Sequence, residues 1–491
     1  MTSAGPDGPG RDAITPGAGG AGRRPRMQPP LDPGFRPMWL VQAELEDEIA
    51  ASGLGARVAL AVEQPGGSVW HRRALVYPSG HPRETVSHHA VERLCKFLLW
   101  SCGGARLYVD GPRALVTFLA DHYATEPTGI FDARFMGPLL FGVPFEVVGV
   151  PEREFPPAHE ASTHLGRHLD GCRIGFDLGA SDRKAAAVID GEVVFSEEIP
   201  WDPGRQADPQ WHFDQIMDSL RRAAAHLPRV DAIGGSSAGA IVNSEVRAAS
   251  LFRSVPSEAF ETRVRGLFRE LQDAWGGIPF VVVNDGEVTA LAGSMMAGAG
   301  GLLGIAMGSS QAAGYVDREG RLTSRIDELA FAPVDDSPEA PSDEWSGDRG
   351  CGVQYFSQQA TARLMAAAAI AVDESAALPE RLVHLQELMA AGNPRADLVY
   401  RTVGTYFGHG LLTYREHYDL DHLLLLGRVM TGAGGDVVIE TARAVLAAED
   451  PAAAEGIVFH VADERQKRHG QAVAAASLAG PRPGDPAGWP R

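Results

Sequence analysis

The chain has 491 residues, enough for two or more packed domains whose hydrophobic core needs no disulfide staples. Its 44 Lys and Arg residues against 63 Asp and Glu give a net charge of −19, so it lacks the broad positive field that binding to nucleic-acid phosphates requires. The four cysteines form no CxxC pair, which argues against a zinc finger and favours a reducing compartment. With neither a secretory signal nor a membrane-spanning apolar run, the chain is expected to be cytoplasmic.

Both ends of the chain are rich in glycine and proline. Residues 1–34 and 481–491 have too few apolar side chains to offset the entropy lost on ordering, so both are interpreted as disordered tails. Between them, β-branched runs alternate with Ala- and Leu-rich helical stretches, which is typical of an α/β protein. The first part is an N-terminal α/β domain (36–150), followed by a Pro- and His-containing linker (151–170).

The N-terminal domain begins with a predicted hairpin over 57–77, turning at Pro65-Gly66-Gly67. A helix over 88–102 follows, then a buried strand (106–110) and a helix (112–123). The first of these helices carries apolar residues at helical spacing, namely Val91, Leu94, Cys95, Leu98 and Leu99. These patterns predict the elements but no role for the domain.

After the linker, strands and helices continue to alternate. Further strands are predicted within 173–199, 231–242, 278–285, 301–317 and 420–436. Helices are predicted at 209–226, 258–275, 287–298, 355–372, 380–391 and 397–416.

Three glycine-bearing turns, over 177–181, 308–314 and 427–435, each follow an apolar strand. Glycine and small hydroxyl residues let backbone N–H groups approach an anion, although each turn alone could be a simple tight connection. Neither the P-loop spacing nor the dinucleotide-binding spacing is present. The candidate nucleotide-binding residues in these turns are Asp177, Gly179, Ser181, Gly308, Ser309, Ser310, Gly432 and Gly434.

The order of these segments carries a family resemblance. DLGASDRKAAAVIDGEVV, VVVNDGEVTALAG, GIAMGSSQAAGYVDREGRL, LLLLGRVMTGAGGDVVIETA and GQAVAAASLAG together resemble the ROK family of bacterial sugar kinases and sugar-responsive repressors. The resemblance covers about 171 to 480. It implies a two-lobed actin-like ATPase (ribonuclease H-like) core, with a first lobe (171–297), a second lobe (298–480) and the additional N-terminal α/β domain.

Asp285 is the candidate catalytic base. It follows the apolar run Phe280–Val283, at the carboxyl end of a strand where ligands of α/β sheets collect, and phosphoryl transfer to a hydroxyl needs such a carboxylate. The alternative is a plain turn leading into a helix with Glu287 in its first turn. The resemblance strengthens the role of base and implies that Asn284, Glu328, Gly235 and Ser236 bind the substrate.

Asp177 is the candidate metal residue, because a carboxylate beside a glycine turn can hold Mg²⁺ next to nucleotide phosphates. The alternative is a buried carboxylate that caps the hairpin. Lys184 flanks the same turn. The resemblance implies ATP and Mg²⁺ as cofactors and a sugar or sugar-like metabolite as substrate.

The chain departs from the family pattern where a zinc segment is usual. Phe331 stands at a metal-ligand His position, Cys351 is the one cysteine left and Gln358 matches a glutamate, so no zinc is predicted. The preceding acidic, Pro-rich segment (334–350) is expected to be a solvated loop, or else a lid. In the second glycine turn, Ser309, Ser310 and Gln311 replace the usual Thr, Gly and Ile, which weakens but does not exclude ATP use.

Two functions remain open from the sequence. The first is an ATP-dependent sugar kinase, and the second is a non-catalytic sugar or nucleotide sensor. The N-terminal domain lacks the two short helices of a DNA-reading module, so nucleic acid is an unlikely partner, and a degenerate copy of one core lobe is another interpretation of this domain. No membrane partner is expected, and a homo-oligomer is compatible with the sequence.

Overall fold

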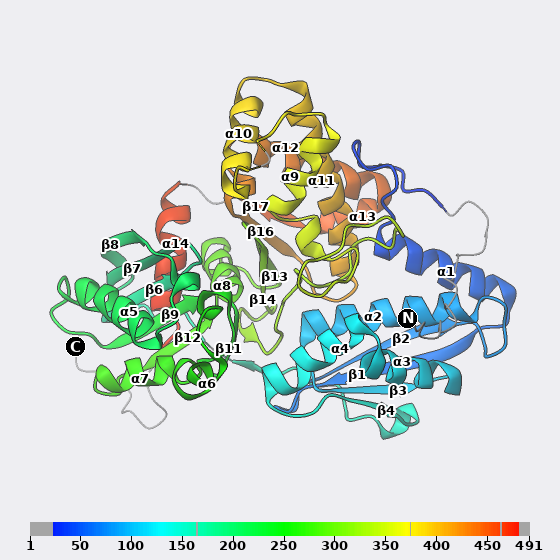
Figure 1. Cartoon of the computed structure of the whole chain (residues 1–491), viewed down its shortest axis with the longest axis horizontal. Helices are drawn as coiled ribbons and strands as arrows, with labels where there is room; N and C mark the ends of the chain where they lie inside the picture. Colours follow the sequence, from blue (N-terminus) through cyan, green and yellow to red (C-terminus); the bar gives the residue numbers. More distant parts are fainter. Residues whose placement is uncertain (1–22, 164, 374, 462–463, 481–491) are drawn as a thin grey trace, which may run out of the picture.

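The computed structural model describes residues 23–163, 165–373, 375–461 and 464–480. Three groups of elements surround the centre of the molecule, each built on its own sheet (Figure 1). Short 3-10 helices connect them at Glu152–Glu154, Pro203–Arg205, Ser250–Phe252, Gly352–Gln354 and Arg428–Met430. None of the helices in the described part is long and apolar enough to cross a membrane.

The region predicted as an N-terminal domain, which keeps that name below, contains a four-stranded sheet of order β2-β1-β3-β4 with helices packed against it. Its elements are α1 (Met38–Ser52), β1 (Ala56–Glu63), β2 (Val69–Val76), α2 (Glu84–Cys102), β3 (Arg106–Asp110), α3 (Arg113–Thr125), α4 (Pro127–Arg134), a π-helix η1 (Phe135–Phe141) and β4 (Glu146–Gly149). The predicted hairpin, both helices and the strand are present, and the apolar stripe of α2 is buried.

The sheet of the first lobe has the order β12-β9-β6-β7-β8. Its strands are β6 (Cys172–Leu178), β7 (Asp182–Ile189), β8 (Glu192–Pro200), β9 (Ala232–Ser237) and β12 (Phe280–Asn284), accompanied by α5 (Pro209–Ala224), α6 (Ser257–Ala259), η5 (Phe260–Val264), α7 (Leu267–Ala274) and the hairpin of β10 (Ala240–Val242) and β11 (Glu245–Ala248). The first three strands form an antiparallel meander, and β9 and β12 continue the sheet in parallel.

The N-terminal sheet has a different topology, because β1 is antiparallel to both of its neighbours and only β3 and β4 are parallel. The interpretation of this domain as a degenerate copy of a core lobe is therefore wrong. The two regions have similar sequence patterns because each contains a hairpin, and hairpins occur in many unrelated sheets.

The sheet of the second lobe has the order β17-β16-β13-β14-β15-β5. It consists of β13 (Leu302–Met307), β14 (Gln311–Val316), β15 (Leu322–Thr323), β16 (His422–Leu426), β17 (Val458–His460) and β5 (Ser162–Thr163). Its helices are α8 (Asp285–Ala297), α9 (Gln358–Ala367), α10 (Leu378–Ala390), α11 (Pro394–Arg415), α12 (Ala433–Glu449) and α13 (Pro451–Gly456). The predicted linker therefore contributes an edge strand, β5.

Two helices cross the predicted boundary between the lobes. α8, assigned to the first lobe, packs on β13 and β14, and α14 (Glu464–Ala476), assigned to the second, packs on β6 and β9. Glycine allows the second contact, since a Cβ atom at Gly234 would lie 1.8 Å from the carbonyl oxygen of Ala475. Each predicted lobe therefore contributes one helix that packs on the sheet of the other lobe.

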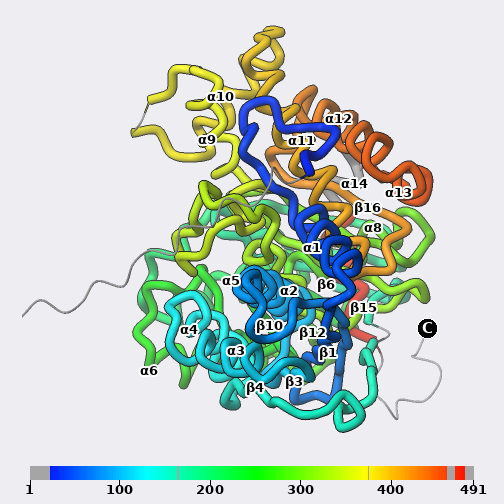
Figure 2. The backbone as a smooth tube through the Cα atoms, turned by 90° about the vertical axis from the view of Figure 1, so that its right-hand side faces the viewer, coloured from blue at the N-terminus to red at the C-terminus, as the bar shows by residue number. Residues whose placement is uncertain are grey.

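The N-terminal segment is more ordered than predicted. Residues 1–22 and 481–491 lie outside the described residues, but 23–34 run along α11 and α12 (Figure 2). Met27 accepts a hydrogen bond from His409 at 2.8 Å, and Tyr406 donates one to Asp32 at 2.6 Å. These partners are distant in sequence, so composition alone could not reveal them.

The N-terminal domain and the second lobe share one hydrophobic core. Trp100 of α2 contacts Phe331, and the same buried cluster includes Leu303 of β13 and Tyr406 of α11. Ala248 of β11 packs at the edge of this cluster, and η1 contacts β11. The additional domain thus contacts both lobes of the core.

Candidate active site

Asp285 lies where β12 ends and α8 begins. Asn284 caps the helix: its side-chain oxygen accepts from the N–H of Gly286 at 2.7 Å, its amide group donates to the carbonyl of Gly239 at 2.7 Å, and its N–H donates to Glu287 at 2.8 Å. The turn followed by a helix, which was the alternative interpretation, is thus also observed. It fixes Asp285 at the first position of the helix. Asn284 is engaged within the protein, and its geometry supports a positioning role.

Asp285 belongs to a group of half-buried or buried carboxyl groups. Burial and the nearby charge of Asp177 raise the pKa of Asp285 to about 7. Burial raises the pKa of Glu287 and of Glu328 to about 8, with neighbouring acids adding to the effect, and it raises that of Asp327 to about 6. Near neutral pH, some of these carboxyl groups are therefore protonated and others are ionised. Sites that carry out acid–base chemistry have the same property.

Asp177 lies at the carboxyl end of β6, in register with Ser236 of β9. Its carboxylate accepts a hydrogen bond from the Ser236 hydroxyl at 2.7 Å, and the Lys184 amine lies 3.7 Å away. The same amine is 3.3 Å from Asp182. Burial raises the pKa of Asp177, whereas Lys184 lowers it. Two predicted residues, Asp177 and Ser236, are thus in direct contact.

Gly235 was predicted to bind substrate, but its surroundings fit a packing role. It lies inside β9, paired with both β6 and β12, and a Cβ atom there would meet the ring of Phe176 at 2.1 Å. Glycine is needed here because the ring covers the strand.

The three glycine turns are brought to one region between the lobes. The Gly179 N–H donates to the carbonyl of Asp182 at 3.0 Å, and the Gly308 N–H donates to that of Ser310 at 2.9 Å, so each closes a tight hairpin. A Cβ atom at Gly427 would lie 2.4 Å from the carbonyl oxygen of Met307. The backbone of the third turn therefore lies directly against the strand that leads into the second turn. Arg428 reaches Asp182 at 4.0 Å and joins the third turn to the first.

Within these turns, Ser309 and Ser310 are exposed and Gly432 precedes the first residue of α12 with a positive φ of 72°. Ser181 donates to Asp182 at 2.9 Å. Gly434 lies against Tyr400, where a Cβ atom would meet the ring at 2.3 Å. Gln311 points inward and donates to the hydroxyl of Tyr414 at 3.3 Å, so its side chain is not directed at a ligand in the turn.

The acidic segment 334–350 is not a solvated loop. Asp348 accepts from Arg93 at 2.9 Å and pairs with Lys96 at 3.0 Å, both on α2, and the hydroxyl of Tyr355 donates to Asp335 at 2.7 Å. The expectation was wrong because its basic partners lie some distance away in sequence. Trp345 remains exposed on this segment.

Apolar packing occupies the region where the family resemblance implied a zinc segment. Phe331 lies 4.3 Å from Trp100 between ring centroids and shares a small buried cluster with Cys351 and Val353. Burial raises the pKa of the Cys351 thiol to about 12. Across the described ranges, no group of three or more Cys, His, Asp or Glu side chains is arranged to hold a metal ion.

Glu328 is held next to the N-terminal domain. The N–H of Asp327 donates to the carbonyl of Ser101 at the end of α2, at 3.0 Å, and Tyr418 donates to the Asp327 carboxylate at 2.7 Å. Sequence reasoning missed Asp327 and underrated Glu287, although each adjoins or closely follows a predicted residue. The contact with Ser101 had no local sequence signal.

Comparison with known proteins identifies the fold. No family model matches the chain, and no curated protein sequence matches it either. A ROK family transcriptional regulator, a homologue of the E. coli MLC protein, superposes with a TM-score of 0.51 at 18% identity, covering 63% of this chain and 79% of that one.

Two kinases overlap the same share of the chain. A ROK hexokinase from Thermus thermophilus has a TM-score of 0.49 at 20% identity and is covered over 97% of its length, with 63% of this chain matched. A ROK glucokinase from Streptomyces griseus, solved with glucose and AMPPNP, has a TM-score of 0.48 at 21% identity and is covered over 99%, again with 63% of this chain matched. The two-lobed actin-like fold expected from the sequence is confirmed for this part of the chain by the regulator.

Proposed function

We propose that this chain, whose core has the two-lobed fold of ROK proteins, is an ATP-dependent phosphotransferase that acts on a hydroxyl of a sugar or sugar-like metabolite. The observation that carries the proposal is Asp285, a half-buried carboxyl group directly after β12 with its pKa raised to about 7 beside Asp177. A base with a pKa near the working pH combines a useful deprotonated fraction with sufficient basicity.

In the proposed reaction, Asp285 accepts the proton of the substrate hydroxyl while that oxygen attacks the terminal phosphorus of ATP, and the bond from that phosphorus to the bridging oxygen breaks to release ADP. Glu328, with its pKa raised to about 8, is protonated in a large fraction of molecules at neutral pH and donates a hydrogen bond to a substrate oxygen. The three glycine turns are the segments assigned to the nucleotide phosphates. Asn284 and Ser236 hold the two acids in place.

Asp177 is the residue assigned to Mg²⁺. Carboxylate oxygens are the ligands that Mg²⁺ prefers, and Asp177 and Asp285 lie close enough for their charges to interact, so a cation beside them relieves the repulsion. When bound, Mg²⁺ neutralises charge on the phosphates. Because it keeps several waters and phosphate ligands, one or two protein carboxylates suffice.

The alternative is a sugar or nucleotide sensor without catalysis. One observation favours it: the Lys184 amine already lies 3.3 Å from Asp182 and 3.7 Å from Asp177, where the kinase needs a cation. A sensor of this kind binds its ligand but does not transfer phosphate.

A thermal-shift screen separates the two, because a ligand that binds only the folded state raises the melting temperature. The kinase predicts a shift with ATP plus Mg²⁺ and with at least one sugar or cyclitol. A sugar shift without any nucleotide shift contradicts the kinase and favours a sugar sensor. A nucleotide shift without any sugar shift favours a nucleotide sensor.

A further inference from the structure

The segment 324–328 leads from β15 to Glu328, the acid assigned to the substrate. The side chains that act on the Glu328 carboxyl group are other acids, Asp285 and Asp327, and among the described residues none donates a hydrogen bond to it. The position of this carboxyl group therefore depends on the backbone that carries it. What holds the segment 324–328 in place thus matters to the substrate site.

The start of the segment is bonded to the N-terminal domain and to the linker. The side-chain amide of Gln64, which follows β1 and is buried, donates to the carbonyl oxygens of Ser324 and Cys102, each at 2.7 Å. The hydroxyl groups of Ser68 and Ser324 are 2.8 Å apart and share a hydrogen bond. The N–H of Ser324 donates to the carbonyl of Ala161 at 3.0 Å. One amide group thus ties the segment to the end of α2.

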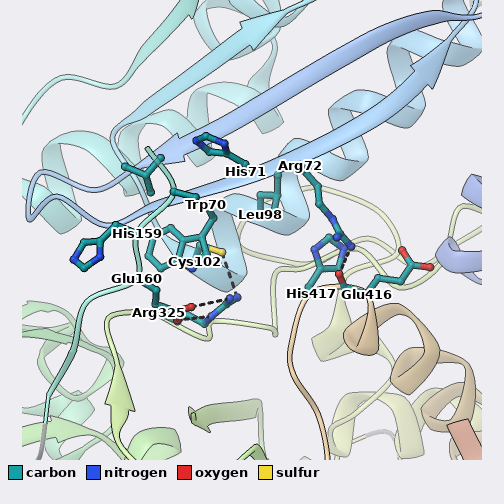
Figure 3. A pocket seen from close by; sticks show the side chains of 12 residues that line it. Trp70, His71, Arg72, Leu98, Cys102, His159, Glu160, Arg325, Glu416 and His417 are labelled. Carbon is teal, nitrogen blue, oxygen red and sulfur yellow. Dashed lines mark hydrogen bonds and ion pairs between the residues drawn. The ribbon is translucent and has the colours of Figure 1, made fainter. Parts of the chain in front are cut away.

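Arg325 fastens the next position to the same helix and to the linker. Its guanidinium group donates to both carboxylate oxygens of Glu160, at 2.8 and 3.2 Å, and to the sulfur of Cys102 at 3.4 Å (Figure 3). The guanidinium carbon lies 4.7 Å from the centre of the Tyr418 ring and 5.6 Å from that of the Trp70 ring. The side chain is only 8% exposed. A buried group of Arg325 therefore joins the linker, the N-terminal domain and the loop after α11.

Asp327 has a backbone conformation that residues other than glycine rarely adopt. Its φ is 49°, in the left-handed region, and its side chain is buried. The N–H of Asp327 donates to the carbonyl of Ser101 at the end of α2, at 3.0 Å, and the hydroxyl of Tyr418 donates to its carboxylate at 2.7 Å. A strained backbone persists only where its surroundings hold it, and these two bonds hold the residue directly before Glu328.

We propose that Arg325 and Asp327 are positioning residues, through which the N-terminal domain and the linker hold Glu328 in the substrate site. Tyr418 completes the arrangement, because its ring faces Arg325 and its hydroxyl group bonds Asp327. The N-terminal domain, for which the sequence indicated no role, thereby contributes to substrate binding without touching the substrate. The inference rests on the proposed function only in assigning Glu328 to the substrate.

Hydrogen exchange of the full chain, followed by mass spectrometry, tests the holding of this segment and needs no ligand. Arg325→Gln removes the charged fork on Glu160, and Tyr418→Phe removes only the hydroxyl donor to Asp327. Each should speed exchange in peptides that cover 324–330 by about tenfold or more. Peptides that cover α8, which carries the catalytic base, should exchange as in the original chain.

The effect on the substrate is measured by calorimetric titration with D-glucose, N-acetyl-D-glucosamine and myo-inositol. With the compound that binds most tightly, Arg325→Gln and Tyr418→Phe should each weaken binding by about tenfold, because a displaced Glu328 loses its hydrogen bond to the substrate. The affinity for ATP should stay within about twofold, since the glycine turns are distant from these changes. Failure of all these compounds to bind would contradict the proposed function alone, because the exchange experiment decides the positioning without a ligand.

Arg318→Gln is the matched control for the loss of an arginine. Arg318 lies in the turn between β14 and β15 and pairs with Asp421 at the surface, 2.9 Å away. This variant should leave both the exchange of 324–330 and the sugar affinity unchanged. Arg325→Lys, which keeps the charge but loses the fork geometry, should give intermediate changes in both measurements, which guards against a variant that fails to fold.

The inference is overturned if exchange of 324–330 stays unchanged in both Arg325→Gln and Tyr418→Phe. Faster exchange with full sugar affinity in both variants would also overturn it, because the two contacts would then support the fold without positioning Glu328. A loss of ATP affinity as large as the loss of sugar affinity would show a general disturbance of the core and would contradict the positioning role.

Discussion

The chemistry proposed for this protein depends on a carboxyl group whose surroundings keep its pKa near neutrality. Asp285 is half-buried, the negative charge of Asp177 disfavours its ionised form, and the hydrogen bond from the Gly286 N–H only partly offsets both effects. A surface aspartate would have a pKa several units lower and would be a weak base. The capping of α8 by Asn284 therefore matters to function because it holds Asp285 in this position.

The first prediction is a pH dependence. The base works when deprotonated, so kcat/KM for the sugar should fall as the pH drops through about 7, by about tenfold per pH unit further down. Initial rates measured between about pH 5 and 9 at saturating ATP test this. A profile that stays flat down to about pH 5 would show that a group with an ordinary aspartate pKa acts instead.

The second prediction concerns Glu328. Because burial and the neighbouring acids raise its pKa to about 8, it acts as a neutral donor near neutral pH, and glutamine can supply a similar hydrogen bond. Glu328→Gln should therefore keep KM for the sugar within about threefold, whereas Glu328→Ala should raise it about tenfold. Equal KM values for the two variants, determined by steady-state kinetics, would remove Glu328 from the substrate site.

At the scale of elements, α2 connects the N-terminal domain to the core. It supplies Lys96, which is completely buried and pairs with Asp132 and Asp348, each at 3.0 Å. It also supplies Trp100, which packs on Phe331, and Ser101, which holds Asp327. The segment around Phe331, where the family resemblance implied a zinc site, is thus held by a helix of the N-terminal domain.

The third prediction follows from that buried pair. Lys96→Met leaves the buried carboxylate of Asp132 without a cation and that of Asp348 with Arg93 alone, so it should lower the free energy of unfolding by about 3–5 kcal/mol in a urea titration. Arg73→Gln, which removes a surface ion pair with Glu152, should cost less than about 1 kcal/mol. A loss in Lys96→Met no larger than in this control would show that the ion pair is not an anchor.

At the scale of the whole molecule, three sheets surround a central junction, and the additional domain touches both lobes of the core through η1, α2 and the segment before Glu328. Its contacts with the second lobe form one continuous core, which favours their movement as a unit. The first lobe is joined to this unit by the smaller contact between η1 and β11 and by α14, which packs on β6 and β9.

How much of this could be predicted depended on whether the signal was local. The hairpin before α2, the stripe from Val91 to Leu99 and the cap at Asn284 follow from short-range spacing, and each is present. The pairing of Lys96 with Asp348 joins residues far apart in sequence, so the acidic segment looked solvated. The charge of Asp177, which helps to raise the pKa of Asp285, likewise comes from a residue far away in sequence, and spacing alone does not show it.

The central claim is tested most directly by following transfer of the terminal phosphate of ATP to a sugar hydroxyl, with the phosphorylated product detected by mass spectrometry. The account predicts product with at least one sugar or cyclitol in the presence of Mg²⁺. It also predicts a loss of at least about 10²-fold in Asp285→Asn with nucleotide affinity retained, and no change in Asp273→Asn, an exposed aspartate on α7. Full transfer by Asp285→Asn would contradict the account.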